Sequence, residues 1–156
     1  MSMRVGLGVD AHAFEDGVQL VLGGVAFDSR RGLAGHSDGD VITHALIDAV
    51  LGAAGLGDIG SLFPSDGSTP VGVSSLDLLR DAVDQVHGAG YVVVNADCIL
   101  IGQEPRIAER RLEMGDLLTS LVGAPVTVRA TTTDGLGFTG RGEGLAAQAV
   151  ALVERS

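Results

Sequence analysis

Three residues near the start of the chain could together hold a metal ion. A single alanine separates Asp10 from His12, and His44 follows shortly after the run HSDGD. One carboxylate and two imidazoles form a donor set typical of a catalytic zinc site, which keeps its fourth position open for substrate or water. The alternative interpretation is an aspartate in a salt bridge and two histidines that serve the core or the surface.

A strand followed by a helix would bring these three side chains together. Residues two apart in a strand point to the same face, so a strand over 4–12 would project Asp10 and His12 side by side. Apolar residues at helical spacing predict a helix over 40–54, with His44 one turn inside it. The three candidate ligands would then converge from two elements.

The rest of the chain reads as alternating strands and helices within one domain, residues 1–156. Such alternation predicts a compact α/β or α+β layer fold. The expected elements are a hairpin over 18–22 and 25–27, a loop over 58–70, a helix over 74–86, a strand over 91–101, a helix over 106–121, a strand over 125–132 and a terminal helix over 145–155.

Composition narrows the class of protein. The net charge is −10, and all ten basic residues are arginines, which argues against nucleic-acid binding. No apolar run approaches the roughly 18 residues that a membrane span needs. The N-terminus has no signal-peptide pattern, and the lone Cys98 is expected to be a buried strand residue. A cytoplasmic protein fits these features. Any phosphate ligand must be bound without the help of lysine side chains.

Two segments could bind phosphate. Residues 35–40 precede the first helix, where His36 could donate a hydrogen bond to an anion at the helix N-terminus. Ser37 or Asp38 is the expected N-cap, and an ordinary capped helix is the alternative. Residues 131–144 contain threonines, five glycines and an aspartate that could hold Mg²⁺ or Mn²⁺. That segment lacks the Gly-Lys-Ser/Thr of a Walker loop, and a plain glycine-rich turn is its alternative.

The segments GLGVDAHAF, LAGHSDGDVITHALIDAVLGAAGLGDIGSLFP and ATTTDGLGFTGRGEGLA resemble one known family closely. The family is 2-C-methyl-D-erythritol 2,4-cyclodiphosphate synthase, and the similarity runs over about residues 4–154. The resemblance implies an α+β subunit with a mixed four-stranded sheet, covered by helices on one face, plus a small N-terminal hairpin. It also implies a homotrimer with active sites between subunits.

The activity that the resemblance implies is that of a phosphorus–oxygen lyase in the non-mevalonate isoprenoid pathway. The substrate 4-diphosphocytidyl-2-C-methyl-D-erythritol 2-phosphate would be converted to the cyclic diphosphate and CMP. Its own 2-phosphate would attack the β-phosphorus. One Zn²⁺ per subunit would polarise the β-phosphate, and Mg²⁺ or Mn²⁺ would span the α- and β-phosphates. Positioning and charge stabilisation would provide the catalysis.

The resemblance also implies roles for individual residues. Asp10, His12 and His44 would bind zinc, Asp134 would bind the second metal, and His36 and Thr132 would stabilise the transition state. Phe138, Arg141 and Glu143 would line a cavity on the trimer axis that takes an isoprenoid diphosphate or another anion. The substrate contacts would be Ser37, Asp58, Ile59, Gly60, the flap residues Phe63, Pro64, Ser65, Asp66 and Gly67, the cytidine-pocket residues Gly102, Pro105, Arg106 and Ala108, and Thr131, Thr133, Phe138 and Arg141.

This sequence departs from the family pattern at several of these positions. Asp134 stands where glutamate is usual, and Arg106 stands where lysine is usual, so the second-metal contact and the cytidine pocket differ in detail. Two other functions fit the same residues. One is a zinc phosphoesterase in which metal-bound water attacks, and the other is a non-enzymatic trimer that senses isoprenoid diphosphates.

Overall fold

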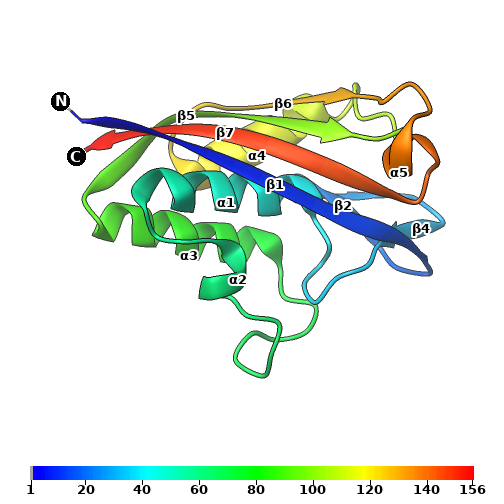
Figure 1. The fold of residues 1–156 in the computed structure, drawn as a ribbon, viewed down its shortest axis with the longest axis horizontal. Helices are drawn as coiled ribbons and strands as arrows, with labels where there is room; N and C mark the ends of the chain where they lie inside the picture. The colour runs from blue at the N-terminus through cyan, green and yellow to red at the C-terminus, as the bar shows by residue number, and fades with distance from the viewer. Residues whose placement is uncertain (1) are drawn as a thin grey trace.

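The structure is a computed structural model that describes residues 2–156, and its centre is a curled mixed sheet (Figure 1). The strand order is β4-β1-β7-β5-β6, and only β5 and β6 run parallel to each other among these neighbours. The strands of this sheet are β1 (Met3–Asp16), β4 (Arg31–Leu33), β5 (Tyr91–Ile101), β6 (Val126–Thr131) and β7 (Gly144–Arg155).

The expectation of four strands was wrong by one strand. β1 continues past the predicted end at His12, and Phe14 at its far end pairs with Leu33 of β4. β4 is only three residues long, so its sequence carries too few alternations to mark it as a strand. The mixed sheet and the α+β class were predicted correctly.

The predicted terminal helix over 145–155 is also wrong, because this segment is strand β7. Its alanine-rich composition favours a helix by intrinsic propensity. Its burial, however, alternates: Leu145 and Val153 are fully buried, whereas Gln148 and Val150 are exposed. β7 pairs with β1 on one side and β5 on the other, so tertiary pairing overrides local propensity.

Three long helices cover one face of the sheet (Figure 1). α1 (Val41–Ala54) lies against β1 and β7, α3 (Ser75–Gly88) packs on α1, and α4 (Arg111–Val122) packs on β6. α4 begins five residues later than predicted, and its N-cap position Arg110 makes no capping hydrogen bond with its side chain. Two short helices, α2 (Ile59–Leu62) and α5 (Gly137–Gly140), lie in segments predicted as loops.

The predicted hairpin around Gly23 and Gly24 is confirmed as β2 (Leu20–Leu22) and β3 (Val25–Phe27), which form a separate two-stranded sheet. Both turn glycines have positive φ, the conformation that side-chain-bearing residues avoid. Cys98 is a buried residue of β5, as predicted, and burial raises the pKa of its thiol to about 12. It is therefore unsuited to act as a nucleophile.

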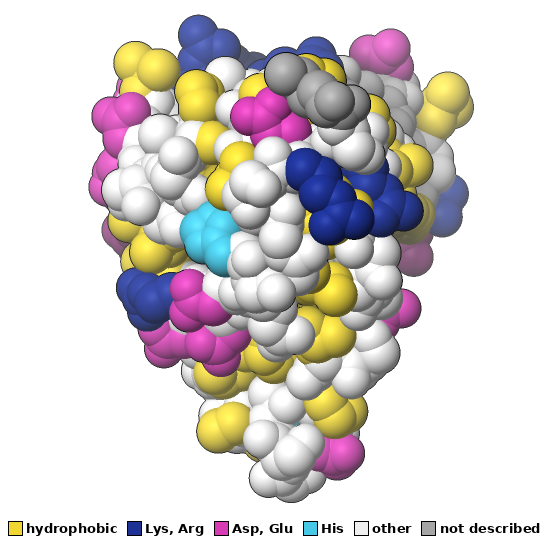
Figure 2. Space-filling view, turned by 90° about the vertical axis from the view of Figure 1, so that its left-hand side faces the viewer, with side chains coloured by type: hydrophobic (Ala, Val, Ile, Leu, Met, Phe, Trp, Pro, Cys, Tyr) yellow, Lys and Arg dark blue, Asp and Glu magenta, His cyan; other side chains and the backbone are white. Residues whose placement is uncertain are grey.

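The other face of the sheet is apolar and exposed along β1. Met3, Val5, Leu7 and Val9 point outward and are 55–68% exposed. An apolar stripe of this kind on a protein surface marks an interaction site. On the face shown in Figure 2, acidic side chains and arginines are interspersed. Within residues 2–156, no helix has the length and apolar character needed to cross a membrane.

Candidate functional site

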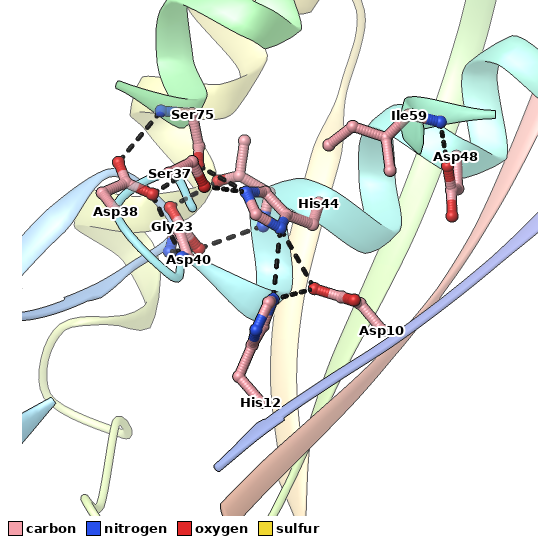
Figure 3. Close-up of polar contacts among 11 residues, drawn as sticks. Asp10, His12, Gly23, Ser37, Asp38, Asp40, His44, Asp48, Ile59 and Ser75 are labelled. Carbon is pink, nitrogen blue, oxygen red and sulfur yellow. Dashed lines mark hydrogen bonds and ion pairs between the residues drawn. The ribbon is translucent and has the colours of Figure 1, made fainter. Parts of the chain in front are cut away.

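The three candidate metal ligands converge at one point (Figure 3). Oδ2 of Asp10 lies 2.7 Å from Nε2 of His12 and 3.1 Å from Nδ1 of His44, and the two ring nitrogens are 3.3 Å apart. Asp10 and His12 project from the helix-facing side of β1, and His44 projects from α1. Two imidazole nitrogens and one carboxylate oxygen at this spacing suit a divalent transition metal such as zinc.

Two glycines allow the helix to approach the strand closely enough for this meeting. A Cβ atom on Gly6 would lie 1.9 Å from the backbone oxygen of Ala49, and one on Gly8 would lie 1.8 Å from that of Ala45. The backbone of α1 therefore lies directly on the backbone of β1. Asp10 and His12 continue the same face of the strand. Residues 6–11, GLGVDA, also match the dinucleotide-binding pattern G-x-G-x-x-A, but here Gly6 and Gly8 serve the packing of α1 on β1.

A buried aspartate fixes the start of α1. Asp40 is fully buried, and its carboxylate accepts hydrogen bonds from the backbone N–H groups of Gly23, Gly24 and Thr43 and from the Thr43 hydroxyl, at 2.6–3.0 Å. Burial raises the pKa of Asp40, and the hydrogen bonds from its donors oppose that shift. Asp40 is the N-cap, so the prediction of Ser37 or Asp38 in that role was wrong. The helix N-terminus is thus capped by the protein's own carboxylate.

The metal ligands line one wall of a pocket of about 170 Å³. The pocket brings them together with several predicted substrate residues, and it adds two residues that the sequence did not single out, Thr69 and Leu78. The other predicted residues at the pocket wall are His36, Ser37, Ile59, Gly60, Phe63 and Ser65.

His36 is oriented by a backbone carbonyl that follows the flap. Its Nε2 lies 2.6 Å from the carbonyl oxygen of Thr69, so Nε2–H donates to that carbonyl. The other ring nitrogen, Nδ1, can then donate to an anion only when the ring is an imidazolium. The Thr69 carbonyl therefore fixes the orientation of the His36 ring at the pocket wall.

The predicted substrate residues around α2 divide into two groups. Ile59 and Gly60 reach the pocket, whereas the Asp58 carboxylate caps α2 by accepting the N–H of Ser61 at 2.8 Å. Asp48, one turn after His44 on α1, accepts the N–H of Ile59 at 2.7 Å and ties α2 to α1. Burial raises the pKa of Asp48. In the rest of the flap, Pro64, Asp66 and Gly67 are not among the residues that line the pocket.

The predicted cytidine residues lie at a second pocket, of about 400 Å³. Gly102, Pro105, Arg106, Thr131 and Thr132 line it, together with Gln103, Ile107 and Ala130, whereas Ala108 is not part of this wall. The two pockets have different lining residues.

Within one chain, therefore, the predicted stabiliser Thr132 and the metal ligands lie at different pockets. Asp134 stays beside Thr132, with its N–H 3.3 Å from the threonine hydroxyl, and its φ of 54° is unusual for a residue with a side chain. Thr133 bonds the hydroxyl of Thr139 at 2.9 Å. Arg141 forms an exposed ion pair with Glu143 at 2.6 Å.

The protonation of the triad predicts how metal-free protein responds to pH. Burial raises the pKa of Asp10, but hydrogen bonds and charges from His12 and His44 outweigh it and leave the pKa at about 2. The hydrogen bond that His12 donates to Asp10 raises the pKa of His12 above 6.5, against the opposing effect of burial. The stabilisation of the folded state by Asp10 is complete above pH 3.8 and is lost as the pH falls toward 2. The stabilisation by His12 is complete below pH 6.5 and is lost as the pH rises through the raised pKa of His12.

We therefore expect Asp10→Asn to destabilise chelator-treated protein most at about pH 5 and much less at about pH 9. Urea unfolding of both proteins at the two pH values measures the difference in unfolding free energy. An equal loss at both values would show that Asp10 does not form this ion pair in solution.

Comparisons with known proteins find similarity over nearly the whole chain. Residues 3–154 match the sequence model of the YgbB family. The 2-C-methyl-D-erythritol 2,4-cyclodiphosphate synthase of Rubrobacter xylanophilus is 54% identical, over 98% of this chain and 96% of that protein.

Two solved structures have the same fold. The bifunctional IspDF of Campylobacter jejuni superposes with a TM-score of 0.95 at 37% identity, covering 99% of this chain and 43% of that one. IspF of Plasmodium falciparum, in a CDP complex, has a TM-score of 0.85 at 29% identity and covers 99% and 97% of the two chains.

Proposed function

Because this chain belongs to the YgbB family, we propose that it catalyses the reaction of the 2-C-methyl-D-erythritol 2,4-cyclodiphosphate synthases that it matches. The 2-phosphate of 4-diphosphocytidyl-2-C-methyl-D-erythritol 2-phosphate attacks the β-phosphorus of the same molecule, a new phosphorus–oxygen bond forms, and CMP leaves. The convergence of Asp10, His12 and His44 on the wall of a pocket is the observation that carries this proposal.

The metal of the site is proposed to be zinc, held by Asp10, His12 and His44. Their one oxygen and two nitrogen donors match the ligand set of a catalytic zinc that keeps an open position. When bound, such an ion supplies a Lewis acid that withdraws charge from the β-phosphate. Mg²⁺ or Mn²⁺ is proposed as the second ion, with Asp134 as its carboxylate ligand.

The protein's own groups position the two reacting phosphates. His36 and Ser37, which lie beside the metal ligands on the pocket wall, hold the attacking 2-phosphate. Ile59 and Gly60 contact the methylerythritol portion, and the flap from Phe63 to Gly67 covers it and keeps water away from the reacting phosphorus. This arrangement uses orientation and preorganised charge, so no covalent enzyme intermediate is needed.

The nucleotide end of the substrate is proposed to bind at the second pocket. Arg106 meets phosphate there, Gly102 and Pro105 face the base, and Thr132 stabilises the charge that develops on the diphosphate. The CDP in the Plasmodium falciparum structure supports a cytidine nucleotide as the ligand class.

A homotrimer is proposed because it would place these two pockets opposite each other across subunit boundaries. The exposed apolar stripe of Met3, Val5, Leu7 and Val9 supports burial of this sheet face against other copies. In such a trimer Phe138 and Arg141 would face the axis and take an isoprenoid diphosphate or another anion, once the ion pair between Arg141 and Glu143 opens.

His36→Ala is expected to leave bound zinc unchanged and to lower kcat by on the order of 10²–10³, the usual effect of removing one donor that stabilises developing charge. Zinc content by atomic absorption and turnover by CMP release measure the two effects separately. A loss of less than tenfold would show that His36 does not stabilise the transition state. Loss of zinc would show instead that it supports the metal centre.

The proposed function is tested by incubating zinc-loaded protein and Mg²⁺ with the cytidyl diphosphate 2-phosphate substrate. Chromatography should show CMP and the cyclic diphosphate appearing in equal amounts. CMP with an open-chain phosphate would make the protein a phosphoesterase. Bound substrate without turnover would favour a binding protein.

A further inference from the structure

The His44 ring is held from both sides (Figure 3). Nδ1 faces Asp10 and His12, at the point where the metal ligands meet. Nε2 faces two hydroxyl groups, those of Ser37 and Ser75, each at 2.8 Å. Ser75 is the first residue of α3 and is fully buried, and it does not line the substrate pocket. Its hydroxyl contacts the ring at Nε2, on the side away from Asp10 and His12.

The direction of each hydrogen bond behind His44 follows from the chemistry of the groups. Asp38 accepts the Ser75 N–H with one carboxylate oxygen, at 2.9 Å, and receives the Ser75 hydroxyl with the other. An ionised carboxylate can only accept, so the single hydroxyl proton of Ser75 points to Asp38. The Ser75 oxygen must then accept from His44, which requires the hydrogen of the ring to be on Nε2.

We propose that Ser75, oriented by Asp38, is a positioning residue that holds the Nε2–H of His44, so that in the metal-loaded protein Nδ1 presents its electron pair to the ion. This inference rests on the proposed metal centre, because Nδ1 is the atom that faces Asp10 and His12. A metal-binding histidine is typically held in this way, by an acceptor on its other nitrogen that sets ring orientation and tautomer. Here the acceptor is a buried serine backed by a carboxylate.

The same arrangement leaves the Ser37 hydroxyl free to donate. Nε2 of His44 carries one hydrogen, which Ser37 and Ser75 share as acceptors. The proton of Ser37 is then free to point into the pocket that Ser37 lines. The two serines therefore act differently: Ser75 orients the metal ligand, and Ser37 is available to an anionic substrate.

The test is the zinc affinity of Ser75→Ala, measured by competition with a chromophoric chelator. The substitution removes the hydroxyl but keeps the backbone N–H that Asp38 accepts, so the start of α3 is retained. We expect zinc Kd to rise by about 10–100-fold, the usual result of losing an outer hydrogen-bond partner of a metal ligand. Co²⁺-loaded protein should show a shifted visible absorption spectrum, because the geometry of the His44 ligand changes.

Thr119→Val is the matched control. The Thr119 hydroxyl also makes two hydrogen bonds, to the backbone N–H and carbonyl of Val126, but it lies between α4 and β6. Thr119→Val should lower the stability of the protein and leave zinc Kd unchanged.

A second variant, Asp38→Asn, should weaken zinc binding less than Ser75→Ala. Combined with Ser75→Ala it should add no further loss in zinc affinity, because Asp38 acts through Ser75.

The possible outcomes separate the two proposals. If wild-type protein binds no zinc, the metal centre is wrong and the role of Ser75 falls with it. If wild-type protein binds zinc and Ser75→Ala binds it within twofold, the positioning role alone is wrong. Equal weakening by Thr119→Val, or full additivity of Asp38→Asn, would assign the effect to general stability and would also overturn the proposal.

Discussion

Replacement of His44 by alanine is expected to abolish stoichiometric zinc binding and, with it, turnover. His44 supplies one of three converging donors, and its Nδ1 lies 3.1 Å from Asp10 and 3.3 Å from His12. Two remaining ligands cannot hold zinc against water and buffer as three can. The loss of affinity should therefore exceed the roughly 10–100-fold that removing an outer hydrogen-bond partner costs.

The control for this prediction is His87→Ala. His87 is exposed near the end of α3, away from the pocket walls, so its removal tests for nonspecific zinc binding by histidine. Equilibrium dialysis against zinc, followed by a CMP-release assay, measures both variants. Retention of one tightly bound zinc by His44→Ala would contradict the assignment of the ligand triad.

Gly8→Ala is expected to disrupt the site from a position outside it. The new Cβ would lie 1.8 Å from the Ala45 oxygen and 2.8 Å from the Ala49 nitrogen, both backbone atoms of α1. Because the clash is with backbone, the helix must move away from β1 and carry His44 with it. We expect the unfolding free energy to fall by about 3 kcal/mol or more, the upper end of overpacking costs, and zinc affinity to fall with it.

Gly52→Ala is a matched substitution within α1 itself. A Cβ at Gly52 meets no atom within 4 Å, and the residue is exposed in the last turn of α1. It should stabilise the protein by about 0.5–1 kcal/mol, the usual advantage of alanine over glycine in a helix. Urea denaturation of both variants gives the comparison. Normal stability and normal zinc affinity in Gly8→Ala would show that close packing of α1 on β1 does not set the ligand geometry.

Residues with strong local signals were predicted well from the sequence. Asp10 and His12 share a strand face because of their spacing alone, and His44 lies on a helix that its apolar pattern defines. β7 was missed for the opposite reason. Its alanines fit a helix locally, and only pairing with strands far away in the sequence makes it extended.

The residues that support the site could not be predicted from the sequence for a similar reason. Ser75 lies 31 residues from His44, and Asp40 caps its own helix while binding a hairpin turn 16–17 residues away. Such contacts have no sequence period, because they depend on where the elements finally pack. Gly8 did carry a signal, but the pattern that contains it resembles a nucleotide-binding motif when it is read without the structure.

The proposed cyclisation requires that a phosphate of the substrate, and no water molecule, attacks the β-phosphorus. It is tested most directly by running the reaction in water enriched in ¹⁸O and analysing both products by mass spectrometry. If the substrate phosphate is the nucleophile, CMP and the cyclic diphosphate should both form without incorporating ¹⁸O. One ¹⁸O atom in either product at each turnover would show that water is the nucleophile, and would contradict the proposed cyclisation.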